Sequence, residues 1–277
     1  MTTNIHILTN DRGPEAFFAL ESARSVAKVL RAPIVQLPED GWQGEIEQLG
    51  QDTIAFIATH GGFGEDGRLQ ATLEAKGVSH THSAAWACAV MTDKHLTKMV
   101  YLELGIATPA WSYVGEQFGT VSDANAWIRK PVKGGSKKGI SLVTRLKSDE
   151  GLLFEVYIPG TLEVSVSVLG HDEPSALPPL VRNRRRDRIG HLTRSRSTIS
   201  RRVARICQDA ALAIHKALGA RGVTKTDFVV GFDDSVFAIE TDALPALGPR
   251  RSTALQIIQS GRSYERFIHM LARDRPI

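Results

Sequence analysis

Apolar residues recur along the first part of the chain in alternating strand-like and helix-like patterns. Residues 3–9 are predicted to form a short strand, and an apolar stripe at helical spacing follows over residues 14–30. Residues 33–37 and 53–58 are predicted to be two more strands, and the second is a continuous apolar run, typical of a buried parallel strand. A helical pattern resumes near Leu69. This order of strands and helices predicts a small α/β domain of about ninety residues.

The rest of the chain mixes helices with pairs of strands. The predicted helices cover residues 93–105, 201–218 and 263–272. The predicted strands lie within 127–143, on both sides of a glycine-rich turn, and over 154–158, 163–169, 226–232 and 236–240. Residues 171–200 have no regular pattern and are predicted to form a long irregular loop. The fold class predicted from these elements is α/β, with α+β character in the later part.

Composition narrows the class of protein without identifying it. The 277 residues are 42% hydrophobic and 23% charged, which is ordinary for a soluble globular protein. No apolar run is long enough to span a membrane, and the N-terminal residues lack the pattern of a signal peptide. The two cysteines, Cys88 and Cys207, lie in unrelated settings, which argues against a disulfide framework or a cysteine metal site. These features predict a cytoplasmic protein with no membrane partner.

Positive charge is concentrated in one segment. The net charge is +4, but ten arginines and a single acid, Asp187, lie between Arg182 and Arg205. Such a run is most often a solvated face or a mobile loop. Binding of nucleotide phosphates or of an acidic substrate is the next interpretation, and residues 184–201 would then form a lid that orders on the nucleotide. Nucleic acid is disfavoured, because no aromatic residues are interleaved with the arginines.

An acidic hairpin is the most informative single stretch, with the sequence TDFVVGFDDSVFAIETD. A two-residue turn at Asp233 and Asp234 would place Asp227 opposite Glu240, with Asp242 on the same face. Opposed side chains lie about 5 Å apart at Cβ, so three carboxylates would converge. Hard carboxylate oxygens suit Mg²⁺, and a divalent cation would relieve their repulsion.

The same register places Lys225 opposite Asp242. The hairpin could therefore also be a solvent-facing acidic end with a surface ion pair, which would stabilise the protein only weakly. On the hairpin alone, the two interpretations stay open.

A glycine-rich turn with basic residues lies upstream, in the segment RKPVKGGSKKG. Glycines let backbone N–H groups point at an anion, and Ser136 adds a hydroxyl donor. The spacing of a Walker A loop is absent. Lys94 and Lys130 could each supply a charge to phosphates, although each alone is more often a surface lysine. Backbone groups near Glu155–Ile158 could read an adenine edge, and Glu163 could bind ribose hydroxyls.

Taken in order, these segments resemble the D-alanine–D-alanine ligase family of the ATP-grasp superfamily. The most specific match is HGGFGEDGRLQATLEAKGVSHTHSAAWACAVMTDKHLTK, and it continues through GIATPAW, RKPVKGGSKKGIS, VYIPGTLEVSVSVLG, ALPPL and TDFVVGF with AIETDALPAL. The resemblance implies an ATP-grasp fold. It consists of a small α/β N-terminal substrate-side domain (residues 1–91), a central subdomain with the glycine-rich loop (92–159) and a C-terminal subdomain with the metal-binding hairpin (160–277). The last two would sandwich the nucleotide.

The resemblance also implies a role for individual residues. The nucleotide site would comprise Lys94, Lys130, Gly135, Ser136, Glu155, Tyr157, Ile158 and Glu163. The metal ligands would be Asp227, Glu240 and Asp242, for two Mg²⁺ ions, with Mn²⁺ as the alternative metal. Lys225, His60 and Ser136 would serve catalysis, and His60, Arg251 and Ser252 would bind the substrates. A homodimer, small-molecule amino-acid substrates and a place in peptidoglycan precursor synthesis are implied in the same way.

The departures from the family cluster at the amino-acid end of the site. Lys225 stands where the family has an arginine that steadies the oxyanion, and Asp242 stands where it has an asparagine. The alignment places Phe17 at the position of the glutamate that helps to fix the first D-alanine, with Glu15 nearby but out of register. The segment that holds the second substrate's carboxylate reads PALGPRRS, so Arg251 or Ser252 would take that part. No tyrosine or lysine lies between Leu180 and Arg205, where the family has a covering loop with both.

Three functions therefore remain open. The first is D-alanine–D-alanine ligase activity on a divergent chain, an ATP-dependent reaction that forms a C–N bond through an acyl phosphate. The second is an ATP-grasp ligase or cyclising enzyme for a different amino acid or a more acidic substrate. The third is a non-catalytic nucleotide-binding protein of the same fold, which the intact set of lysines and carboxylates disfavours.

Overall fold

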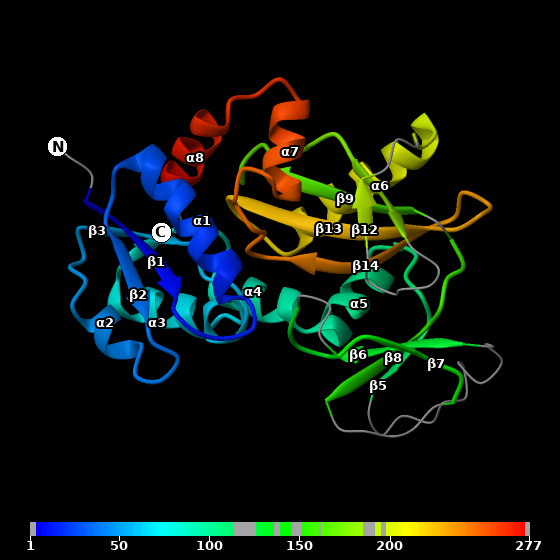
Figure 1. Cartoon of the computed structure of the whole chain (residues 1–277), viewed down its shortest axis with the longest axis horizontal. Coiled ribbons are helices and arrows are strands. Elements are labelled where there is room, and N and C mark those ends of the chain that lie inside the picture. Colours follow the sequence, from blue (N-terminus) through cyan, green and yellow to red (C-terminus); the bar gives the residue numbers. More distant parts are fainter. Residues whose placement is uncertain are drawn as a thin grey trace.

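Three β-sheets form the framework of the protein in a computed structural model (Figure 1). The structure describes residues 4–113, 126–135, 139–145, 151–160, 162–184, 192–194 and 198–274. The sheets follow one another along the chain, and the helices lie against them or between them.

The N-terminal sheet is parallel and has the strand order β2-β1-β3-β4. Its strands are β1 (Asn4–Asn10), β2 (Ile34–Leu37), β3 (Thr53–Ile57) and β4 (Ser79–His80). The helices of this region are α1 (Ala16–Leu30), α2 (Gln43–Glu47) and α3 (Arg68–Lys76), with a short 3₁₀ turn, η1 (Gly62–Gly64). All five residues of β3 are buried, as its continuous apolar run predicts.

The second sheet is antiparallel and has the order β5-β8-β6-β7. Its strands are β5 (Trp111–Tyr113), β6 (Trp127–Pro131), β7 (Ser141–Val143) and β8 (Leu152–Val156). Two helices precede it, α4 (Ala85–Thr92) and α5 (Lys94–Glu103). The carboxylate of Asp93 caps α5 by accepting from the backbone N–H groups of His95 and Leu96, which fixes where this helix begins.

The third sheet has the order β12-β11-β9-β13-β14, with β10 paired to β9. Its strands are β9 (Leu162–Leu169), β10 (Ser175–Ala176), β11 (Leu180–Arg184), β12 (Leu192–Arg194), β13 (Val223–Val230) and β14 (Val236–Asp242). Helix α6 (Arg201–Ala217) packs on this sheet, and the chain ends with α7 (Ser252–Gln259) and α8 (Tyr264–Arg273).

Alternation along β9 divides the third sheet into an apolar face and a polar face. Val164, Val166 and Val168 are buried in one cluster with apolar residues of α6. Ser165 and Ser167 point the other way, where Ser167 hydrogen-bonds Thr253 and Gln256 of α7. The period-2 pattern of this segment is thus confirmed, and it leaves the polar face available for a site.

The C-terminal helices return to the N-terminal sheet. Phe267, Ile268 and Leu271 of α8 share a buried cluster with Ile7 of β1 and Val26 of α1. Figure 1 shows α8 beside α1. The three sheets fall within the three predicted residue ranges, but the division of the chain into domains at residues 91 and 159 stays a prediction.

Two predictions about local structure are wrong. Residues 171–200 are not one irregular loop, because β10, β11 and β12 lie there. These strands are two, five and three residues long, which is too short for alternation to identify them reliably. The turn of the acidic hairpin is also longer than predicted, since the backbone N–H of Gly231 donates to Ser235 at 2.8 Å, and Val230 pairs with Val236.

A β-bulge restores the predicted pairing further along the hairpin. Phe228 pairs with Ala238, yet Asp227 pairs with Glu240, so Ile239 is the extra residue. The longer turn shifts the register by one residue and the bulge shifts it back. Asp227 therefore lies opposite Glu240, and Lys225 opposite Asp242, as the sequence predicts.

Within the described residues, no helix is both long and apolar enough to cross a membrane.

Gly67 provides a test of how α3 and α4 pack. Its φ is +93°, and a Cβ placed on it would lie 2.4 Å from the backbone oxygen of Ala85. We expect Gly67→Ala to lower the free energy of unfolding by about 2–4 kcal/mol, as left-handed strain and overpacking add. Gly41→Ala is the matched control, because Gly41 has φ +79° and a Cβ added there would meet nothing within 4 Å, so only the strain of about 1–2 kcal/mol remains. If urea denaturation shows equal losses of unfolding free energy in the two variants, the close approach of Gly67 to the backbone of Ala85 is refuted.

Candidate active site

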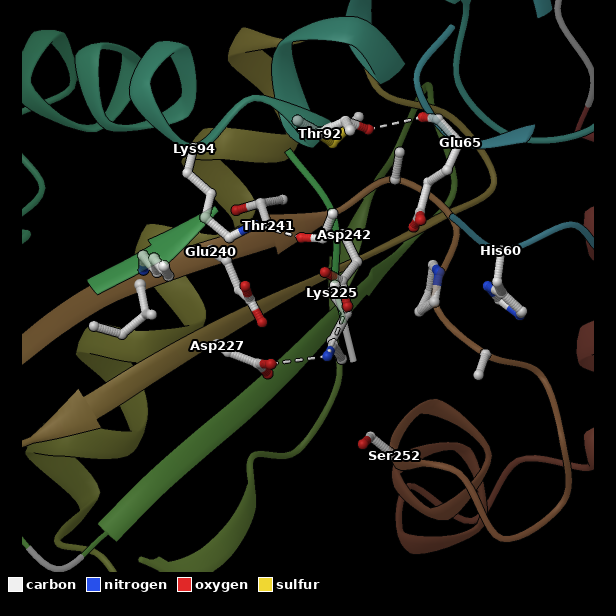
Figure 2. Close-up of a pocket in the computed structure, with 18 of the residues that line it drawn as sticks. His60, Glu65, Thr92, Lys94, Lys225, Asp227, Glu240, Thr241, Asp242 and Ser252 are labelled. Carbon is white, nitrogen blue, oxygen red and sulfur yellow. Dashed lines mark hydrogen bonds and ion pairs between the residues drawn. The ribbon is translucent and has the colours of Figure 1, made fainter. Parts of the chain in front are cut away.

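A cavity of about 390 Å³ lies where the three sheets meet. Its walls come from the β3 end and the turn after it, from the second sheet, from the polar face of β13 and β14, and from the segment that leads to α7. Figure 2 shows the hairpin residues on one side of this cavity and His60 and Glu65 on the other.

Lys225 lies at the centre of the acidic hairpin. Its Nζ is 2.8 Å from Oδ2 of Asp227 and 2.7 Å from Oδ2 of Asp242, so one ammonium joins carboxylates of two strands (Figure 2). Burial lowers the pKa of Lys225, but the three nearby carboxylates outweigh burial and hold that pKa well above its ordinary value. The lysine is therefore charged at neutral pH.

The neighbouring strands fix the orientation of Asp227. Ser165 of β9 donates a hydrogen bond of 2.6 Å to Oδ1 of Asp227, while Lys225 contacts Oδ2. On the opposite face of the hairpin, the hydroxyl of Tyr101 lies 2.7 Å from Thr241, which lies 3.0 Å from Thr226. The hairpin is thus attached to α5 on one face and presents its carboxylates to the cavity on the other.

The charges of the hairpin suit a divalent cation. Three carboxylates face one ammonium, which leaves a net negative charge. Burial raises the pKa of Asp242, and repulsion from Glu240 and Asp227 adds to this against the attraction of Lys225. In the part of the chain that the structure describes, no group of three His, Cys, Asp or Glu side chains is arranged as a metal site. In the hairpin, the ammonium of Lys225 lies between the carboxylates of Asp227 and Asp242. Asp227, Glu240 and Asp242 as metal ligands stay a prediction that this crowding supports.

Basic residues line the opposite wall of the cavity. Lys130 is 2% exposed, and its Nζ donates to Oε1 of Glu155 at 2.8 Å. Lys94, at the start of α5, donates to the backbone oxygen of Gly134 at 2.5 Å, and Gly135 lines the cavity beside it. Ser136, predicted to lie in the same loop, is outside the described residues. Two cationic side chains and a glycine turn therefore face the carboxylates of the hairpin.

Most of the residues predicted for the nucleotide base and ribose line the cavity. Glu155, Ile158 and Glu163 do so, together with Val156, which the sequence did not single out. Tyr157 is not among the lining side chains. Its backbone N–H donates to Ala126, which holds the end of β8 in place. A contact of Tyr157 with the nucleotide base stays a prediction.

His60 is buried and uncharged. Burial lowers its pKa to about 4, against a backbone hydrogen bond with Leu244 that favours the charged form. Because a carbonyl oxygen only accepts, the imidazole N–H donates to the backbone oxygen of Leu244, and Nε2 accepts from the hydroxyl of Ser22 at 3.0 Å. Ser22 also accepts from the backbone N–H of Leu247. His60 thus connects β3, α1 and the segment before α7, which makes it a neutral positioning group at the cavity wall.

Arg251 and Ser252, predicted to bind substrate, both line the cavity, and each has a polar partner. Arg251 contacts Oε2 of Glu21 at 2.5 and 2.6 Å and lies over the ring of Phe18, 4.5 Å from its centroid. Ser252 accepts from Arg182 at 2.7 Å. Two arginines therefore meet at the start of α7, from different elements, and both remain partly exposed.

Two glutamates that the sequence analysis did not place in the site also line the cavity. A Cβ on Gly61 or on Gly135 would lie 2.7 or 2.9 Å from the carboxylate of Glu15, so this side chain lies between the two loops. Phe17, at the position where the alignment expects the glutamate, is 71% exposed and does not line the cavity, whereas Glu15 does. Glu65 accepts from Gly61 at 2.9 Å, and burial, followed by repulsion from Asp242 and Glu15, raises its pKa to about 8. Its place in the GEDG run was the signal that could have found it.

The arrangement of a glycine-rich hairpin with buried lysines across a cavity from an acidic hairpin is that of the ATP-grasp fold. No family model matches the chain. Over all of its length the chain is 26% identical to the D-alanine–D-alanine ligase of Pelagibacter ubique, covering 99% of that protein. Over 89% of its length it is 29% identical to the D-alanine–D-alanine ligase of Desulforamulus reducens, covering 90% of it.

Solved structures agree on the fold. The D-alanine–D-alanine ligase of Bacillus anthracis, crystallised in complex with ATP, superposes with a TM-score of 0.82 at 20% identity, over 97% of this chain and 96% of that one. The ligase from Coxiella burnetii gives 0.79 at 19% identity, over 97% and 94%. The resemblance to the D-alanine–D-alanine ligase family is thus confirmed over nearly the whole chain.

The ring of His60 provides a test of the hydrogen bonds at this wall. We expect its carbon-bound protons to titrate in NMR spectra near pH 4 rather than 6.5, because the buried ring resists a second proton. His60→Gln assigns the signal. In Ser22→Ala the midpoint should rise, since the hydroxyl that donates to the neutral ring is gone. A midpoint near 6.5 in the unmodified protein would contradict the buried, neutral state.

Proposed function

We propose that the protein is an ATP- and Mg²⁺-dependent ligase that joins the carboxylate of one amino acid to the amine of another, in the manner of a D-alanine–D-alanine ligase. The observation that carries this proposal is the cavity itself. Two lysines and a glycine turn face three carboxylates across it, in a chain that is similar throughout to ligases of this name. The reaction would form a dipeptide for peptidoglycan precursor synthesis.

The basic wall would bind the nucleotide. Lys94 and Lys130 would contact the phosphates, and Gly135 and Ser136 would close over them. Glu155, Tyr157 and Ile158 would surround the base, with Glu163 at the ribose. Support comes from position, since Lys130 is buried at the cavity wall, and Glu155 is the one partner of its Nζ within the described residues, which leaves ammonium hydrogens for a phosphate.

Asp227, Glu240 and Asp242 would hold two Mg²⁺ ions, with Mn²⁺ as the alternative. Bound ions would neutralise the phosphate oxygens during transfer of the γ-phosphoryl group to the substrate carboxylate. Glu240 lines the cavity and makes no hydrogen bond or ion pair within the described residues, so both its oxygens are available as ligands. Asp227 would stay anchored to Ser165 and Lys225, and Asp242 to Lys225, while they ligate.

Lys225 would supply the cation for the second step. Attack of the amine on the acyl phosphate puts negative charge on the carbonyl oxygen, and a fixed ammonium close by would stabilise it. Lysine keeps the charge of an arginine but lacks its two-pronged geometry. The carboxylates of Asp227 and Asp242 would compensate for this, because their ion pairs fix the position of the Lys225 Nζ.

The amino acids would occupy the end of the cavity near His60. Glu15 would attract the ammonium of the first substrate, and Arg251 or Ser252 would bind the carboxylate of the second. His60 would position this wall rather than transfer protons at neutral pH, because it is uncharged and both ring nitrogens are engaged.

A second candidate is a ligase or cyclising enzyme for a different, more acidic substrate. Arg250 favours it, because this side chain lines the cavity and has no hydrogen bond or ion pair within the described residues. Together with Arg182 and Arg251, it gives the substrate end more positive charge than one α-carboxylate requires. A non-catalytic nucleotide-binding protein remains the third candidate. A homodimer and a cytoplasmic location stay predictions.

One assay separates the candidates. Purified protein is incubated with ATP, Mg²⁺ and a panel of D- and L-amino acids that includes acidic ones, and ADP release and product mass are recorded. ADP together with D-alanyl-D-alanine supports the first candidate. ADP formation with another substrate alone supports the second, and ATP binding without turnover of any substrate supports the third. Failure to bind ATP would eliminate the first two.

The metal assignment gives a sharper expectation. Asp227→Asn and Glu240→Gln should each lower turnover by at least about a hundredfold, because loss of a metal ligand removes several kcal/mol of transition-state stabilisation. Asp234→Asn is the matched control: this exposed residue of the same hairpin has φ +62°, which asparagine tolerates. Its turnover should stay within about twofold of the unmodified protein. Thermal melting shows whether the variants are folded, and folded variants with unchanged rates would rule the assignment out.

A further inference from the structure

Lys98 is a buried cation that no substrate or metal role accounts for. Its side chain is fully buried in α5, one turn after Lys94, and it does not line the cavity. A charged group without access to water is costly unless its surroundings compensate for it. What surrounds Lys98 therefore indicates why a lysine stands there.

Three acceptors and one aromatic ring surround Lys98. Its Nζ donates to Oγ1 of Thr108 at 2.6 Å and to the backbone oxygen of Pro109 at 3.2 Å. It lies 3.0 Å from Oε2 of Glu155 as an ion pair, and 5.3 Å from the ring centroid of Trp111. Two hydrogen bonds and one ion pair thus hold the ammonium within the protein, and because Lys98 does not line the cavity, it does not reach a ligand there.

Glu155 connects Lys98 to the cavity. Its Oε2 faces Lys98 and its Oε1 faces Lys130, at 3.0 and 2.8 Å, so one buried carboxylate lies between two ammonium groups. Burial alone would raise the pKa of Glu155, but Lys130 and Lys98 outweigh burial and lower it. The carboxylate is therefore ionised, and the three groups together carry one net positive charge.

Lys130 is the member of this group whose ammonium faces the cavity. Glu155 is the only ion-pair or hydrogen-bond partner of its Nζ within the described residues, so the remaining hydrogens can be donated to a ligand. Without Lys98, the charge of Lys130 would be cancelled by Glu155. With Lys98 in place, the carboxylate is shared, and Lys130 keeps both a fixed direction and an effective charge.

We propose that Lys98 is a positioning residue of the nucleotide subsite, which acts through Glu155 to fix the ammonium of Lys130 and to keep this wall of the cavity net positive for phosphate binding. The proposal deepens the proposed function and rests on it, since it assumes that the phosphates of a nucleotide lie against Lys130. Glu155 then has two roles: it lines the cavity, and it is the counter-ion of both Lys98 and Lys130.

The proposal predicts a dependence of nucleotide affinity on pH. Burial, opposed by Glu155 and reinforced by Lys130, lowers the pKa of Lys98 to about 8. Below this pH the lysine is charged and the wall is positive, and above it the lysine is neutral and the wall carries no net charge. Affinity for an anionic nucleotide should therefore fall as the pH rises through about 8. Glu65, across the cavity, also has a pKa raised to about 8, so variants must separate the two groups.

The experiment measures the Kd of ADP without metal by calorimetry, from pH 7 to 9.5, with adenosine as the uncharged probe. In the unmodified protein the Kd of ADP should rise about tenfold across pH 8, as expected for the loss of one charge near the phosphates, while that of adenosine stays level. Lys98→Arg should keep tight binding without the step, since arginine does not deprotonate in this range. Lys98→Met should bind about tenfold more weakly at pH 7 and show no step.

Two further variants serve as controls. Glu65→Gln should retain the step, which shows that Glu65 does not cause it. Lys133→Met removes an exposed lysine of the same glycine-rich segment, and it should also retain the step. If Lys98→Met does not fold, as thermal melting will show, Lys98→Arg alone decides the matter.

The outcomes distinguish this inference from the proposed function. A step that persists in Lys98→Arg, or an equal step for adenosine, overturns the role of Lys98 while ATP binding stands. An ADP Kd that does not change across pH 8 in the unmodified protein also overturns the role of Lys98. Failure of the unmodified protein to bind ADP or ATP at any pH overturns the proposed function itself.

Discussion

The pairing of β13 with β9 on one side and β14 on the other is the constraint on which the rest of the structure depends. It places Ser165 and Glu240 beside Asp227, and Asp242 beside Lys225. Because side chains alternate between the two faces of a sheet, a slip by one residue would turn the carboxylates into the apolar layer under α6. The same register buries the valines of β9 against α6. The strand register that forms the apolar core therefore also brings the carboxylates of the acidic hairpin together.

The cavity collects more charge than the interior of a protein usually holds, and each charge has a particular partner. Lys225 joins two carboxylates at one end, and Glu155 joins two lysines at the other. The two arrangements are opposite in sign: the hairpin is left net negative and the lysine wall net positive. A nucleotide with its metal ions presents this same separation, with anionic phosphates on one side and cations on the other. The electrostatics of the cavity thus agree with the fold.

The substrate end is less regular than the nucleotide end. There the contacts join segments from opposite ends of the chain, such as Arg251 with Glu21 and Leu247 with Ser22. The N-terminal helix and the segment before α7 must both be in place before this end exists. Its arginines make it the region where the chain departs most from the family it resembles, and so the region that would set the choice of amino acid.

The local sequence was enough to predict most of the helices and strands and the contacts between neighbouring strands. Alternation identified β9 and the two strands of the acidic hairpin, and the predicted facing of Asp227 and Glu240 is correct because the longer turn and the bulge cancel. Local geometry controls such features, so the local sequence reports them. Family resemblance then added Lys94 and Lys130, which the structure brings to one cavity, while their roles toward a nucleotide stay predictions.

Features that depend on contacts between distant segments became visible only in the folded chain. It placed Glu15 rather than Phe17 at the cavity, because the loops of Gly61 and Gly135 close around that position. It showed the longer turn and the bulge at Ile239, whose two shifts cancel, and the strands hidden within residues 171–200. It buried Lys98 behind Glu155. Periodicity carries no information on which remote segment covers a side chain, and burial by such segments is what turns an ordinary lysine or glutamate into part of a site.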